Sequence, residues 1–136
     1  MNVINYVIHP ECCFIDKYEG ELFEMAACGY TEGMYLVIFT NDGGWIPHFH
    51  VFNNQNPKKT TFNACLKLET PEYFKHGTHT DILNAKQVKQ LIKFLKTEKE
   101  PGITWWRFLI STWNSNNSKQ ELPYDLPMPD YTTLNM

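Results

Sequence analysis

Two histidines separated by one residue stand in residues 42–54, "DGGWIPHFHVFNN", after a Gly-Gly pair and a proline. Side chains at positions i and i+2 of a β-strand point to the same face, so a strand here would present His48 and His50 together. We expect that face to be polar and partly exposed. Imidazole nitrogens bind metals and transfer protons, so the pair predicts a metal site, a catalytic pair or a structural feature of the sheet.

Two more histidines, His76 and His79, follow in "KHGTHTD", with Asp81 beside them. A catalytic zinc ion is held by three protein ligands and keeps a fourth position open for water or substrate. The four histidines could supply such a set. A metal-assisted hydrolase would use His48, His50 and one of His76 or His79, with Zn²⁺ as its cofactor.

A facing strand would add a thiol and an amide to the same patch. If the loop of residues 54–59 is symmetric, His50 lies opposite Asn63. The same register places His48 opposite Cys65. A cysteine beside a histidine also has the composition of a nucleophile and its base, which is a further arrangement for this patch.

Three known histidine-based enzyme patterns match only in part. A nucleotide-binding histidine triad needs a third alternating histidine, where this chain has Phe52. Two-histidine phosphoesterases need two His-x-Thr/Ser motifs, and "HGT" at His76 supplies one. Metal cupins place a glutamate after His-x-His, whereas the first acid after His50 is Glu69. The sequence thus predicts a histidine cluster and leaves open whether the chain is an enzyme.

The elements that position these residues follow from hydrophobic periodicity. Residues 34–39, "MYLVIF", are apolar on both faces and rich in β-formers, which is typical of a central strand. Turn residues separate residues 48–52 from residues 60–68, so we expect an antiparallel meander of three strands within residues 34–69. Three earlier segments are short apolar runs, the first two predicted as strands and the third as a strand or a helix: residues 3–8, 12–18 and 20–30.

Two helices are predicted after the strands. The first spans residues 84–98, begins at the N-cap Asn84 and has an apolar i, i+3, i+4, i+7 stripe. The second spans residues 103–114 with the same spacing. The stripes consist of Val88, Leu91, Ile92 and Leu95 and of Trp106, Leu109, Ile110 and Trp113. The predicted fold class is α+β, with an antiparallel meander and two C-terminal helices packed on one face.

The chain of 136 residues has the length of one domain. Residues 1–117 are predicted to form it, and residues 118–136 an extended Pro-rich tail that is either loose or laid on the surface. The first residues lack the pattern of a secretory signal, and no apolar run is long enough for a membrane span. We expect a cytoplasmic protein whose four cysteines are reduced thiols.

Charge is unevenly distributed along the chain, whose net charge is −3. Residues 1–33 contain six acids and one base, whereas residues 58–107 contain ten bases and five acids. In the first predicted helix, lysines recur opposite the apolar stripe at Lys86, Lys89, Lys93 and Lys96. This stripe could bind nucleic-acid phosphates or an acidic protein partner, or it is an ordinary solvated face.

Trp105 is a further candidate binding residue, because it lies outside the apolar stripe of the second predicted helix. Together with Phe108 it would line a partner interface or accept the Pro-rich tail. Trp106 and Trp113 share the apolar stripe and are expected in the core.

The order of these features resembles a family of small bacterial domains of unknown function. "WIPHFHV" is similar to the family's Pro-Pro-His-Phe-His-Val motif, with Ile46 in place of the first proline. "WWRFLISTWN" is similar to its Leu-x-x-x-Trp helix through Leu109 and Trp113. The resemblance covers residues 34–117 and implies a bacterial or phage setting beside toxin–antitoxin-like or mobile-element genes. We therefore expect a small binding module with a protein or nucleic-acid partner, and a metal-assisted hydrolase as the alternative.

Overall fold

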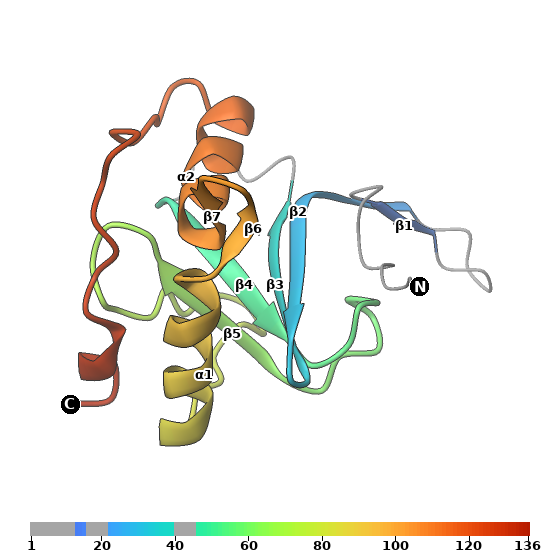
Figure 1. Cartoon of the computed structure of the whole chain (residues 1–136). Coiled ribbons are helices and arrows are strands. Elements are labelled where there is room, and N and C mark those ends of the chain that lie inside the picture. Colours follow the sequence, from blue (N-terminus) through green and yellow to red (C-terminus); the bar gives the residue numbers. More distant parts are fainter. Residues whose placement is uncertain (1–12, 16–21, 40–45) are drawn as a thin grey trace.

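The structure is a computed structural model that describes residues 13–15, 22–39 and 46–136. It has the predicted α+β architecture, with an antiparallel sheet of strand order β1-β2-β3-β4-β5. Figure 1 shows helices α1 and α2 and the C-terminal segment on the same side of this sheet. The elements are β1 Cys13–Ile15, β2 Leu22–Thr31, β3 Met34–Phe39, β4 His48–Phe52, β5 Asn63–Lys67, α1 Ala85–Leu95, β6 Glu98–Glu100, β7 Ile103–Thr104, α2 Trp105–Asn116 and the 3₁₀ turn η1 Tyr131–Thr133.

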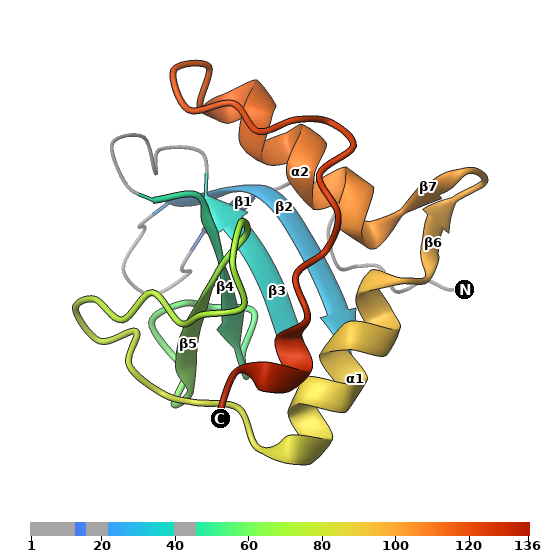
Figure 2. The same ribbon diagram turned by 90° about the vertical axis from the view of Figure 1, so that its left-hand side faces the viewer.

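The predicted meander is confirmed in strands β3, β4 and β5, which lie side by side with β2 in Figure 2. Of residues 20–30, which fitted a strand or a helix, the structure describes residues 22–30, and these belong to β2. The strand predicted at residues 3–8 lies outside the described residues. Of the strand predicted at 12–18, the structure describes residues 13–15 as β1.

The predicted register between β4 and β5 is wrong by two residues. The loop between the two strands was predicted to span residues 54–59. The pair next to the loop is Phe52 with Asn63, so the loop spans residues 53–62. Asn53 closes this loop through side chains instead of the ladder: its backbone N–H donates to Thr60 Oγ1 at 3.0 Å, and its side-chain N–H donates to Thr61 Oγ1 at 2.7 Å. Because the shift is an even number, each side chain stays on its predicted face.

Helix α1 begins as predicted and ends earlier. Asn84 and Gln87 form a capping box, in which each side chain accepts a bond from the backbone N–H of the other. The helix ends at Leu95, before the predicted residue 98. The chain then forms β6, turns at Gly102 with a φ of 83°, and returns as β7. Residues 98–104 are therefore a small hairpin between the helices.

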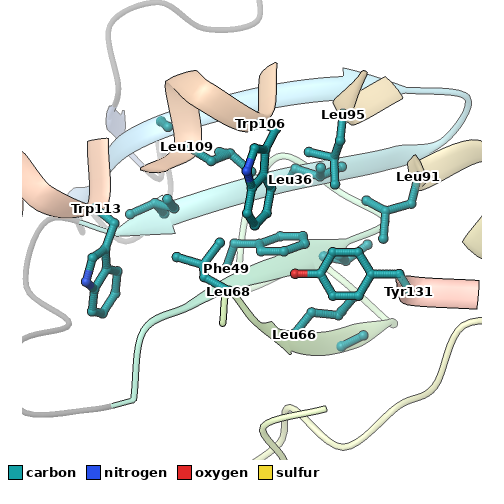
Figure 3. Close-up of a cluster of buried hydrophobic side chains, with 14 of the residues drawn as sticks. Leu36, Phe49, Leu66, Leu68, Leu91, Leu95, Trp106, Leu109, Trp113 and Tyr131 are labelled. Carbon is teal, nitrogen blue, oxygen red and sulfur yellow. The ribbon is translucent and has the colours of Figure 1, made fainter. Parts of the chain in front are cut away.

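The core fills the space between one face of the sheet and the helices (Figure 3). Sheet and helix side chains meet as predicted, and Trp106 and Trp113 are buried there. Ile92, predicted in the apolar stripe, is half-buried and packs against the edge of this cluster. Figure 3 labels ten of the buried residues: Leu36, Phe49, Leu66, Leu68, Leu91, Leu95, Trp106, Leu109, Trp113 and Tyr131.

Residues 118–136 are laid on the body and also enter its core. The indole N–H groups of Trp106 and Trp113 donate to the carbonyls of Leu126 and Gln120 at 2.9 and 3.1 Å. Tyr131 has no exposed surface, and its hydroxyl donates to the carbonyl of Lys67 on β5 at 2.5 Å. Leu122 and Tyr131 of this segment are buried, so it is neither loose nor only laid on the surface.

Candidate metal centre

Strand β4 presents His48 and His50 on one face, as predicted, while Phe49 and Val51 point into the core on the other. The two Nε2 atoms are 3.2 Å apart. The expectation of a polar, partly exposed face is wrong, because His48 is fully buried and His50 is 3% exposed. The sheet is therefore covered on both faces at this strand.

A segment after β5 covers the histidine face and is named here the histidine loop (residues 72–81). It is fixed to β5 at both ends: the N–H of Phe74 donates to the carbonyl of Cys65 at 2.9 Å, and the N–H of Asp81 donates to the carbonyl of Asn63 at 3.0 Å. Between these points His76 and His79 form an antiparallel bridge. Both imidazoles face the pair on β4: the ring centroids of His76 and His48 are 5.6 Å apart, and those of His79 and His50 are 4.7 Å apart.

Asp81 is used in this attachment. Its Oδ2 accepts the backbone N–H of Asn63 at 2.9 Å, so this carboxylate fixes the histidine loop to β5. The side chain expected beside the histidines as a further acid is thus engaged with the strand backbone. The corrected register places Cys65 opposite His50 and Lys67 opposite His48.

Three side chains from β4, β5 and the histidine loop converge as potential metal ligands. One ligand atom each of His48, Cys65 and His76 lies within 4.8 Å of the other two. His48 and Cys65 are buried, and His76 is partly exposed. Cys65 was predicted on this patch opposite His48, and it joins the set from its place opposite His50.

The hydrogen bonds of two of these imidazoles define which nitrogen faces the group. His48 Nδ1 is 2.6 Å from the carbonyl oxygen of Ile46, and His76 Nδ1 is 2.9 Å from that of Phe74. A carbonyl oxygen only accepts, so each Nδ1 carries a proton, and in the neutral imidazole the lone pair is then on Nε2. Metal-bound histidines characteristically donate their second ring N–H to such an oxygen.

Two further imidazoles flank this group. The rings of His50 and His79 have centroids 4.7 Å apart, and the centroid of His50 is 4.8 Å from that of His48. The Nε2 atoms of His48 and His50 are 3.2 Å apart and share a hydrogen bond, so His50 adjoins the group without being one of its three converging ligands.

Aromatic side chains surround the cluster. The ring of Phe74 stacks on His76 with centroids 4.3 Å apart, and Trp113 lies 5.6 Å from His48. On the other flank Phe39 lies 5.0 Å from His50. Within the described residues, the convergent group contains imidazole and thiol and no carboxylate. This donor set suits zinc and other transition metals and not magnesium or calcium.

The predicted binding residues of the helices lie away from this cluster. The four lysines of α1 are exposed on its outer side. Trp105 is half-buried and stacks on Phe94 with centroids 4.8 Å apart. Both rings press against Gly29 of β2, where an added Cβ would lie 2.9 Å from each. The indole hydrogen bonds to the C-terminal segment come from Trp106 and Trp113, and a partner role for Trp105 stays a prediction.

In comparisons with known proteins, the chain matches no family model, no curated protein and no solved structure. The resemblance of "WIPHFHV" to a bacterial family therefore stays a prediction. Within the described residues, no helix is long and apolar enough to cross a membrane.

Proposed function

We propose that this protein binds a Zn²⁺ ion through His48, Cys65 and His76. The observation that carries the proposal is the pair of carbonyl hydrogen bonds at the Nδ1 atoms of the two histidines. They hold both imidazoles in the tautomer that presents Nε2 to the group, as in known zinc sites. The ligand atoms come from two strands and a loop that the backbone already holds together.

The proposed reaction class is metal-assisted hydrolysis. Three protein ligands leave a fourth position of a tetrahedral ion for water, and zinc lowers the pKa of a bound water to about 7. His48 and Cys65 are buried on the sheet, whereas His76 is partly exposed. Water and substrate would therefore approach from the side of the histidine loop, with His50 next to the ion.

The experiment is metal binding by matched variants. Purified protein loaded with zinc is analysed for metal content, and protein loaded with Co²⁺ is examined for a thiolate-to-cobalt absorption band. His76→Ala and Cys65→Ala should each lose the ion. His79→Ala removes an imidazole of the same loop, and Cys28→Ala removes a buried thiol elsewhere in the sheet. Both controls should keep one ion per chain.

Loss of metal in the control variants to the same extent would overturn the assignment of ligands, and absence of metal from the wild-type protein would overturn the site. His50→Ala decides the reaction class. An open, hydrolytic site keeps its zinc in this variant. If instead the ion is lost, His50 is a fourth ligand, the site is closed and structural, and the hydrolase proposal fails.

A further inference from the structure

The outer side of helix α1 carries four exposed lysines and is independent of the proposed metal centre. Their spacing of three, four and three residues keeps the side chains within an arc of about 80° around the helix axis. The stripe is about 15 Å long from the first lysine to the last. Its members are Lys86, Lys89, Lys93 and the C-cap residue Lys96.

The stability of the helix explains only part of the lysine stripe, because the helix dipole favours a cation at Lys93 and Lys96 in the last turn and at the C-cap, and not at the other two positions. No acid occurs between residues 82 and 97, and within the described residues none of the four lysines forms an ion pair. Neighbours at i+3 and i+4 carry like charge, which destabilises a helix. Lys86 also lies in the first turn, where the helix dipole disfavours a cation. A stability role would have favoured acids at some of these positions.

The composition of this side also distinguishes between classes of partner. Protein interfaces are poor in lysine and depend on aromatic or arginine anchors at their centre. The outer side of α1 offers point charges, and its large apolar residues Val88, Leu91 and Leu95 are buried on the other side. A phosphodiester backbone needs no anchor, because lysines bind it through charge alone.

We propose that the lysine stripe of α1 binds the sugar–phosphate backbone of nucleic acid without reading its sequence. The net charge of −3 belongs to the whole chain, whereas residues 82–97 contain none of its fifteen acids. Local charge, and not the chain's total, governs contacts within a Debye length of about 8–10 Å. Four phosphate contacts are expected when all four lysines engage a duplex.

The test measures binding of the full chain to a labelled DNA duplex of mixed sequence at several salt concentrations. Four contacts predict a slope of log K against log salt of about −3.6, which weakens binding about 150-fold between 50 and 200 mM salt. The stripe variant changes Lys86, Lys89, Lys93 and Lys96 to Gln. The matched control changes four other exposed lysines to Gln and has the same net charge: Lys58, Lys59, Lys75 and Lys119.

The expected result is loss of DNA binding in the stripe variant and retention in the control. The stripe variant should unfold at the same or a higher temperature than the wild type, because like-charge repulsion is removed. Three results would overturn the proposal: no binding to DNA at low salt, equal loss in both variants, or binding of polyglutamate or anionic vesicles but not of DNA.

Discussion

Replacement of Tyr131 by phenylalanine tests whether the C-terminal segment is an integral part of the fold. The ring of Tyr131 is fully buried, and its centroid is 6.2 Å from the ring centroid of Phe49 and 6.4 Å from that of Trp106. Its hydroxyl donates to the carbonyl of Lys67 at 2.5 Å. Tyr131→Phe keeps the ring and removes this one hydrogen bond, so the carbonyl on β5 loses a buried donor.

The magnitude follows from that lost bond. A buried acceptor deprived of its partner costs about 1–3 kcal/mol. An unfolding entropy of about 2.1 cal/mol/K per residue over 136 residues makes each kcal/mol equivalent to about 3.5 °C. Tyr131→Phe should therefore lower the unfolding temperature by about 3.5–10 °C. Tyr131→Ala also removes the ring and should cost about 3–5 kcal/mol or more.

The assay is thermal unfolding followed by circular dichroism, with Tyr124→Phe as the control. Tyr124 lies in the same segment and is 60% exposed, so loss of its hydroxyl should change stability by less than about 0.5 kcal/mol. Equal unfolding temperatures for Tyr131→Phe, Tyr131→Ala and the wild type would refute the reasoning. The segment would then be bound too weakly to contribute to the core.

Three further predictions concern the core, alkaline pH and zinc. Leu91→Ala should destabilise the protein by about 2–5 kcal/mol in urea unfolding, because Leu91 is fully buried in α1, whereas Lys89→Ala on its exposed side should be nearly neutral. Burial raises the pKa of Tyr131 and of Tyr73 above 10, so stability should be complete below pH 10 and fall as the pH rises further, which pH-dependent urea unfolding measures. Zinc at a hundred times its dissociation constant should stabilise the protein by about 2.7 kcal/mol, measured as a thermal shift that His48→Ala abolishes.

The sequence sufficed for the meander and the helices because their signals are local. Strand β3 is apolar on both faces, and α1 has its capping box and apolar stripe within a few residues of each other. The register between β4 and β5 was not predictable in this way. It depends on how Asn53 bonds to Thr60 and Thr61 within a ten-residue loop, and the identity of such side-chain bonds is not visible in hydrophobic periodicity.

The sequence predicted which residues form the candidate site better than it predicted how deeply they are buried. Alternation along a strand placed His48 and His50 on one face whatever the register. It could not indicate that residues 72–81 fold back over that face, because this depends on backbone bonds to β5 at Cys65 and Asn63. The predicted exposure was therefore wrong. The shift of register by two residues also places Cys65, and not the predicted Asn63, opposite His50.

The position of the proposed zinc in the fold separates its role from that of the core. The main core lies on one face of the sheet with the helices, whereas His48, Cys65 and His76 lie on the other face under the histidine loop. An ion there would connect the histidine loop to both β4 and β5. The described backbone hydrogen bonds attach the loop to β5. Loss of the ion should therefore loosen the histidine loop first and leave the helices packed on the sheet. Since His76 comes from that loop, the loop that completes the proposed site is also the element that the ion would hold in place.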